Sequence, residues 1–361
     1  MRASVTETVP AVGQRSRRPW SIPVPGVLRA AEAIAFWLVT APFLALLPAG
    51  IGYRAACWRG DWTFRSDPGK RDEITNNLRL VLGEELGGQE AERMTREVFR
   101  QRNCWIIDVM RMRGNGRGLG KLVEIRGREH LDAALAGGKG AILCSSHQGS
   151  FHSSFSLIHA SGYPVTSIGR WWWEFPPGGT SAVVRRMWEL VYGRRVDRHR
   201  HRPNMAPWPG RWQVAVRAAN VLRANEVVTI CCDPPPLAEE LPRAVEVPFL
   251  GGSGRFVPGV VALAQATGAP VLMISIRRLP DYRHQVVEIS PPVPMDGETT
   301  VAFERCAAAV ETVIRAHPAE WDIWYNLEDL IRMGLIPNAS QQAATAGART
   351  DQETELQQSS R

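Results

Sequence analysis

A histidine in the middle of this chain follows a short apolar run, which is how α/β enzymes present a catalytic imidazole. The run Ala141–Cys144 ends at small polar residues, and His147 comes directly after them. Gly149 is expected to let backbone and substrate approach closely, and Ser150 to cap a helix. A neutral imidazole in this place can accept the proton of an alcohol and make its oxygen a nucleophile. The pattern favours His147 as a general base; a histidine that only ends a strand is the alternative.

Segments typical of strands and of helices alternate around this histidine. Short apolar strands separated by helices predict an α/β fold with a mixed, largely parallel sheet flanked by helices. The expected strands are Leu122–Ile125, Ala141–Cys144, Val165–Ile168, Val227–Cys232, Ala244–Phe249, Val271–Ile276 and Val286–Ile289. The expected helices are Asp72–Leu82, Gln89–Met112 and residues 128–136, 149–161, 180–191, 211–224, 257–267 and 300–317.

An apolar segment near the amino terminus predicts a membrane-associated helix within residues 26–60. Ala33–Tyr53 carries no charged residue, and about 20 apolar residues are enough to cross a bilayer. Pro42 and Pro48 interrupt a straight span, so an interfacial or kinked anchor and a buried core helix are alternatives. Several arginines precede the segment, which predicts activity at the cytoplasmic face of the cell membrane.

Composition and charge fit a folded protein with anionic partners. The net charge is +7, and 13 of the 361 residues are tryptophan, which favours membrane interfaces. We expect a basic, disordered segment at 1–25, one catalytic domain at 70–335 and a disordered tail at 336–361. No nucleic-acid-binding motif occurs in the sequence. The six cysteines lack metal-type spacing and indicate a reducing compartment.

Blocks of sequence spread over residues 30–330 resemble a known family. The first block contains the histidine, and the last lies near the end of the expected domain. In order along the chain, the blocks are Gly140–Phe151, Tyr163–Arg170, Ile230–Pro234 with Val247–Gly252, Pro258–Val271 and His317–Trp321. In content and order they are similar to the bacterial lysophospholipid acyltransferase superfamily, in the branch that contains the late lipid A biosynthesis acyltransferases.

This resemblance implies an acyltransferase that needs no cofactor. The donor would be an acyl thioester, carried by coenzyme A or by acyl carrier protein, and the acceptor a hydroxyl of a membrane glycolipid or phospholipid. The family histidine, here His147, would act as the general base. The implied substrate-binding residues are Gly149, Ser150, Arg170 and Arg255, of which Arg170 would contact phosphate of the acceptor.

The chain departs from the family pattern at the partner of this histidine. The family carries Asp or Glu five residues after the histidine, whereas this chain has His152. A neutral His152 can still accept a hydrogen bond, but it supplies no negative charge. Losing the anionic partner of a catalytic histidine costs on the order of 10⁴ in rate in a serine-protease triad. A replacement acid is therefore expected, and Asp233 and Glu174 are the candidates.

The departure leaves several interpretations open. The chain is an active acyltransferase with a rearranged dyad, or a weak or inactive member that binds lipid. A metal-dependent hydrolase that uses His147, His152 and His159, with Asp233 as a fourth ligand, is a further alternative, as is a structural histidine cluster. No G-x-S-x-G nucleophile motif or phosphate-binding glycine loop occurs in the required context.

Two further segments are candidates for substrate contact. Tyr192–Arg202 is the densest basic run and could hold an anionic head group or the acidic surface of acyl carrier protein; an exposed loop without a specific role is the alternative. Trp171–Trp173 follows Arg170 directly, and three adjacent indoles cannot share one helix face. We expect at least one of them to meet lipid, substrate or solvent.

Overall fold

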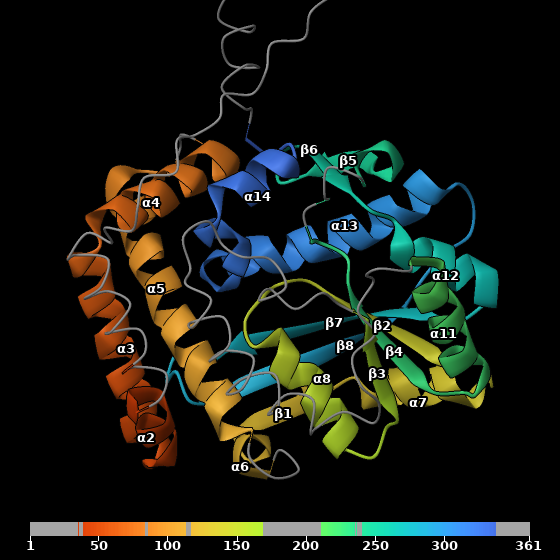
Figure 1. Ribbon diagram of the computed structural model, residues 1–361, viewed down its shortest axis with the longest axis horizontal. Coiled ribbons are helices and arrows are strands. Elements are labelled where there is room, and N and C mark those ends of the chain that lie inside the picture. Colours follow the sequence, from red (N-terminus) through yellow and green to blue (C-terminus); the bar gives the residue numbers. More distant parts are fainter. Residues whose placement is uncertain are drawn as a thin grey trace, which may run out of the picture.

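The structure is a computed structural model in which residues 35, 39–83, 86–112, 117–168, 211–234, 236 and 240–336 are described. Its strands are β1 (Val123–Arg126), β2 (Ala141–Ser145), β3 (Val165–Ile168), β4 (Val227–Cys231), β5 (Val245–Phe249), β6 (Gly252–Phe256), β7 (Val271–Arg278) and β8 (Gln285–Val293). Its α-helices are α2 (Ala41–Leu46), α3 (Ala49–Ser66), α4 (Pro68–Leu82), α5 (Gly88–Arg111), α6 (Arg117–Gly120), α7 (Arg128–Ala136), α8 (Phe151–Ala160), α11 (Arg211–Arg223), α12 (Gly259–Thr267), α13 (Thr299–Ala316) and α14 (Leu327–Arg332). Figure 1 shows the sheet at the centre with helices around it.

The main sheet is mixed and largely parallel, as the sequence predicts. Its strand order is β1-β8-β7-β2-β4-β3, and only the β7–β8 pair is antiparallel. Strands β5 and β6 form a separate antiparallel pair. Strand β6 was not predicted, because its glycines and polar residues lack the apolar pattern of a strand. The parallel centre places the carboxyl ends of β2 and β4 side by side at one edge of the sheet.

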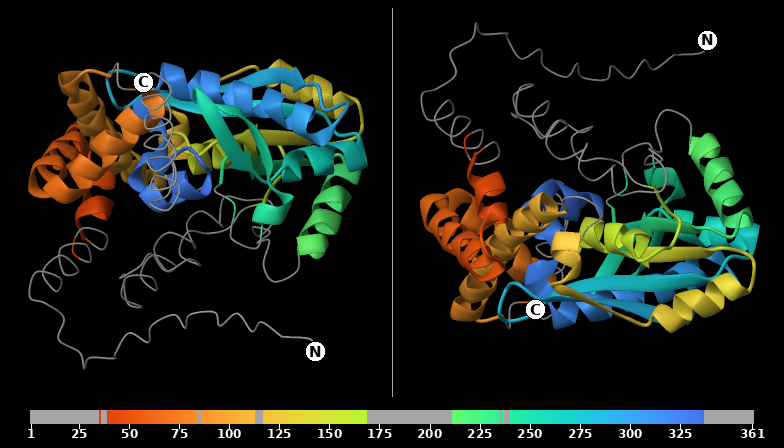
Figure 2. Two further views of the ribbon diagram at one scale, coloured as in Figure 1. Left: turned by 90° about the horizontal axis from the view of Figure 1, so that it is seen from above. Right: turned by 90° about the horizontal axis from the view of Figure 1, so that it is seen from below.

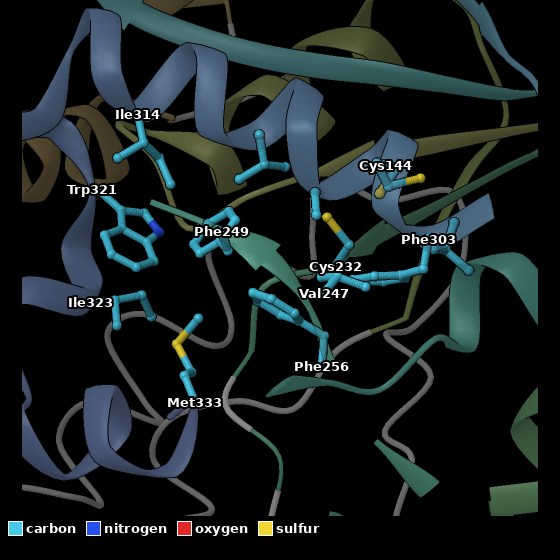
Figure 3. Packing of buried hydrophobic residues seen from close by; sticks show 14 of the residues in the cluster. Cys144, Cys232, Val247, Phe249, Phe256, Phe303, Ile314, Trp321, Ile323 and Met333 are labelled. Atoms are coloured by element: carbon cyan, nitrogen blue, oxygen red, sulfur yellow. The ribbon is translucent and has the colours of Figure 1, made fainter. Parts of the chain in front are cut away.

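Alternating side chains of β2 pack into two separate cores, one on each face of the sheet. Ile142 and Cys144 lie in a cluster with residues of α11, α12 and α13. Ala141 and Leu143 point the other way, into a cluster with residues of α7 and α8. All five residues of β2 are buried, as expected for a central strand covered on both faces. Figure 3 shows part of the first cluster, where aromatic side chains such as Phe249, Phe256 and Phe303 gather beneath α13.

Helices α2 to α5 stand together beside one end of the sheet (orange in Figures 1 and 2). Helices α3 and α5 approach so closely at Gly60 that an added Cβ would lie 2.7 Å from the Cα of Arg100. The described part of the predicted anchor is two helices separated at Leu47–Pro48, not one straight helix. Among the described residues, no helix is both long and apolar enough to cross a bilayer. A membrane anchor within residues 26–60 therefore stays a prediction.

A buried ionic cluster joins these helices to the sheet. At its centre is Asp108 of α5, whose side chain is fully buried and forms an ion pair with the equally buried Arg278 of β7. The hydroxyl of Tyr53 donates to Asp108 Oδ1 at 2.5 Å, and Gln285 Nε2 donates to the same oxygen at 3.1 Å. Ser150, which precedes α8, donates to Asp108 Oδ2. One carboxylate thus connects α3, α5, β7, β8 and the segment that follows His147.

Replacing this carboxylate by an amide should destabilise the whole protein. Asp108→Asn leaves the Arg278 guanidinium buried without its counter-ion, which costs about 3–5 kcal/mol of the free energy of unfolding. Asp72→Asn, at a side chain that is 65% exposed, is the matched control and should change stability by less than about 0.5 kcal/mol. Urea denaturation of the two variants measures the difference. Equal midpoints for both would contradict this role of Asp108.

Candidate active site

His147 and Asp233 lie at the carboxyl ends of two neighbouring parallel strands. In the β2–β4 register, Ser145 is paired with Cys231. Each strand therefore ends two residues before a candidate site residue. The side chains of His147 and Asp233 consequently lie close together at the carboxyl ends of the strands. The carboxyl edge of a parallel sheet is where α/β enzymes place their ligands.

The carboxylate of Asp233 contacts His147 through both the ring and the backbone. His147 Nδ1 lies 2.8 Å from Asp233 Oδ1. The backbone N–H of His147 donates to both carboxylate oxygens, at 3.0 and 2.8 Å. The side chain of Asp233 is only 1% exposed, whereas that of His147 is 28% exposed. A neutral imidazole that donates from Nδ1 to this carboxylate keeps its lone pair on Nε2, where it can accept a proton.

The electrostatic surroundings make His147 a stronger base than a free histidine. Burial lowers the pKa of His147, but the charge of Asp233 and its hydrogen bond raise the pKa by more, and Asp322 and Asp329 add to the rise. The net result is a pKa above the usual value of 6.5. The same charges would stabilise the imidazolium that forms when the ring accepts a proton.

The segment 318–322 holds the loop that carries His147. Asp322 N–H donates to the carbonyl of His147 at 2.9 Å, and Gly149 N–H donates to the carbonyl of Glu320 at 2.8 Å. Between these bonds, Gln148 and Trp321 form an isolated antiparallel bridge. The loop that carries His147 is therefore bound along its backbone by residues 318–322, which we call the clamp segment.

Trp321 connects this clamp to the carboxylate. Its indole Nε1 donates to Asp233 Oδ2 at 2.8 Å, and its side chain is fully buried. The ring packs edge-on against Phe249 and Trp324, with centroid separations of 6.1 and 4.7 Å. In Figure 3 the indole lies among apolar side chains that include Phe249 and Ile323. Packing thus fixes the direction in which the indole N–H points, and that direction is toward Asp233.

Gly149 is needed for packing against the sheet, and its expected role near substrate stays a prediction. Its φ is +53°, and an added Cβ would lie 2.8 Å from the carbonyl oxygen of Ile276 and 3.0 Å from Glu320 Oε2. A side chain at this position would clash with β7 and with the clamp segment. Burial raises the pKa of Glu320 to about 7, against the lowering effect of the Arg278 backbone N–H.

The other described residues predicted for the site have contacts of their own. The ring of His152 packs between Phe151 and Trp105. Ser150 is fully buried and its hydroxyl is directed at Asp108 instead of capping α8. Arg255 lies on β6 and donates to the carbonyl of Ile331 at 3.4 Å. Arg170, Glu174, Trp171–Trp173 and Tyr192–Arg202 fall outside the described residues.

The three-histidine metal site is not assembled. His159 directs Nδ1 at the carbonyl of Tyr163, 3.0 Å away. Among the described residues, the group of potential metal ligands that comes together consists of His147, Cys231 and Asp233, whose ligand atoms lie within 4.8 Å of one another. Cys231 is the last residue of β4, and sequence reasoning did not select it because its spacing matches no metal motif.

A groove of about 600 Å³ lies on the other side of the clamp, between α5 and the β7–β8 connection. It shares Gln101, Ala319 and Glu320 with a small cavity of about 20 Å³ that reaches Gly149. Arginines and glutamates both line its wall, and Arg96 and Arg100 both bind Asp61. Neither His147 nor Asp233 lines it, so we do not assign the groove to the reacting groups.

Trp321 is the residue that contacts the candidate site and was not predicted from the sequence. Trp321 is the last residue of the motif His317–Trp321. That motif does not indicate that the indole N–H donates to Asp233, 88 residues earlier in the chain. For the acid itself a signal was present: Asp233 follows its strand by two residues, as His147 does. What this arrangement can do is take a proton at Nε2, hold the resulting positive charge beside a buried carboxylate, and return the proton.

Comparison with known proteins identifies the family of this chain. The family model described as bacterial lipid A biosynthesis acyltransferase matches residues 26–173 and 180–326. The phosphatidylinositol mannoside acyltransferase of Mycobacterium tuberculosis (strain CDC 1551 / Oshkosh) is 28% identical over 267 residues, which are 70% of this chain and 75% of that protein. The resemblance inferred from the sequence is confirmed: the chain is an acyltransferase and belongs to the bacterial lipid A biosynthesis acyltransferase family.

Proposed function

We propose that this acyltransferase moves a fatty acyl chain from an acyl thioester to a hydroxyl of a membrane glycolipid or phospholipid, with His147 as the general base. The observation that carries the proposal is the 2.8 Å contact between His147 Nδ1 and the buried carboxylate of Asp233. In this role Asp233 replaces the acid that the family places where this chain has His152. An inactive, lipid-binding member is the less favoured alternative, because it was motivated by the loss of that acid.

The proposed reaction is direct transfer without an acyl-enzyme. Nε2 of His147 accepts the proton of the acceptor hydroxyl, and the oxygen attacks the carbonyl carbon of the thioester. The tetrahedral intermediate then collapses with cleavage of the carbon–sulfur bond. The departing thiolate takes the proton from Nε2, so the products are a lipid ester and the free thiol of the donor carrier. Asp233 stabilises the imidazolium between these two proton transfers.

The acceptor to test first is suggested by the mycobacterial relative. Its name specifies an acyltransferase that acts on phosphatidylinositol mannoside, and the family name specifies lipid A. Both are phosphate-containing glycolipids, which agrees with the net charge of +7. We therefore propose an anionic glycolipid with a free sugar hydroxyl as acceptor, with long-chain acyl-coenzyme A or acyl carrier protein as donor.

Removing either member of the dyad should abolish most of the acyl transfer. General-base catalysis contributes about 10²–10⁴ in rate, so His147→Ala should lower kcat by that factor. Asp233→Asn keeps the size of the side chain but removes the charge, and we expect a loss of about 10²–10⁴. His130→Ala, which removes a half-buried histidine of α7, is the matched control.

The measurement is acyl transfer from radiolabelled acyl-coenzyme A to phosphatidylinositol mannoside or lipid A precursors, with binding to lipid vesicles measured in parallel. Unchanged vesicle binding with lost transfer supports the enzyme. If His147→Ala transfers acyl chains as fast as the His130→Ala control, the proposed base is wrong.

Trp321→Phe should impair turnover more than substrate binding. The variant keeps an aromatic ring in the core but removes the N–H that donates to Asp233 Oδ2. A hydrogen bond to a charged group contributes about 1.5–3 kcal/mol, so we expect kcat to fall about tenfold or more with little change in KM.

Trp324→Phe provides a matched control for this substitution. Trp324 is also fully buried, but its indole donates to the carbonyl of Pro318 instead of a carboxylate. Steady-state kinetics of both variants tests the difference. Equal kcat values for the two would show that the indole N–H of Trp321 has no special role.

The exposed faces of α2 and α3 support a position at the membrane surface. Phe43 and Leu46 of α2 are 58% and 65% exposed, and Trp58 and Trp62 of α3 are 69% and 42% exposed. Arg54, on the same helix as the tryptophans, is also exposed. Apolar and tryptophan side chains beside arginine are suited to an anionic lipid surface. We propose that this face rests on the cytoplasmic leaflet of the cell membrane.

Substituting the two exposed tryptophans should weaken membrane association. Trp58→Ser/Trp62→Ser removes apolar area that would enter the interface, and we expect binding to anionic vesicles to fall about tenfold or more. Leu80→Ser/Val301→Ser removes two apolar side chains that are 58% and 43% exposed elsewhere and is the control. Vesicle co-sedimentation measures both variants. Equal binding by wild type and the tryptophan variant would rule out this face.

A further inference from the structure

We propose that a zinc ion binds to His147, Cys231 and Asp233 and reversibly blocks acyl transfer. The inhibition rests on the proposed function, because two of the three ligands are the proposed base and its acid. The binding itself does not, because it depends only on which side chains the fold brings together.

The sheet register brings these three ligands to one point. Cys231 ends β4 and Asp233 lies two residues later, so both approach the end of β2, where His147 lies. One ligand atom from each residue lies within 4.8 Å of the others. A zinc ion with bonds of about 2.0–2.3 Å holds its ligand atoms about 3.3–3.7 Å apart in tetrahedral geometry. Small side-chain movements are therefore enough to close the site.

The chemistry of the ligands selects zinc over the abundant hard cations. A thiolate, an imidazole and a carboxylate are typical zinc ligands, whereas magnesium and calcium prefer oxygen ligands alone. Three protein ligands leave a fourth position for water. His147 is the partly exposed member of the group, with 28% of its side chain accessible, and gives the ion access from solvent.

Binding of zinc is incompatible with the proposed base. Coordination requires the Cys231 thiol to lose its proton to solvent. It also requires the proton that His147 Nδ1 donates to Asp233 to move to Nε2, because the ion takes the place of that proton between Nδ1 and Oδ1. A metal-bound imidazole whose partner carboxylate is also engaged cannot move a proton between acceptor and thiolate. Asp233 Oδ2 can keep its hydrogen bond from Trp321 Nε1, so the clamp need not open.

Cobalt substitution tests the site without any measurement of activity. Co²⁺ bound to a thiolate absorbs in the near ultraviolet, and the full-length protein with added Co²⁺ should show this band. Cys231→Ser should lose the band. Cys57→Ser should keep it, since Cys57 is a half-buried thiol on α3, beside Cys104, and is not one of the three clustered ligands. A band that persists in Cys231→Ser, or its absence in the wild type, overturns the proposal.

Inhibition is measured as the acyl-transfer rate of each protein relative to its own rate in a chelator. Zn²⁺ should inhibit the wild type and Cys57→Ser at the same concentration, while Cys231→Ser should need about tenfold more or higher. Mg²⁺ should not inhibit. If the cobalt band behaves as expected but zinc leaves the rate unchanged, the metal site stands and the proposed role of the dyad fails. If zinc inhibits Cys231→Ser and wild type equally, the site proposed here is wrong.

Discussion

The structure of the active site depends on one buried carboxylate. Asp233 is 1% exposed, and a charge removed from water must be compensated by donors that the protein holds in place. His147 supplies two donors and Trp321 a third. The donors come from two parts of the chain and the carboxylate from a third, so satisfying this single charge fixes the end of β2, the end of β4 and the segment after α13 relative to one another.

A second buried carboxylate, Asp108, helps to hold the loop that contacts the first one. It accepts from Ser150, and it pairs with Arg278, whose backbone N–H donates to Glu320. The loop from His147 to Ser150 is therefore held on one side by the clamp segment and on the other by α5 and β7. If His147 is the general base, these contacts hold its ring in the position that proton transfer requires.

Elements that follow from the apolar pattern of a short segment were predicted from the sequence. Elements and contacts that depend on residues far apart in the chain were not. Apolar runs located β2 and β4, because a central parallel strand is buried on both faces. Strand β6 was missed because it is held by pairing with β5, not by its own apolar pattern. Asp233 was a candidate acid because it lies in a block that resembles the family, Ile230–Pro234. The indole donor of Trp321 depends on packing against Phe249 and Trp324, which no spacing reveals.

The long separations within the site have a consequence for the newly made protein. His147 and Asp233 are 86 residues apart, and Trp321 follows 88 residues after Asp233. During synthesis, helices α2 and α3 leave the ribosome long before residues 318–322 do. Domains fold as their residues emerge. The proposed proton-transfer centre therefore cannot be complete before residues 318–322 have left the ribosome. If His147 is the base, acyl transfer begins only after this late segment has folded.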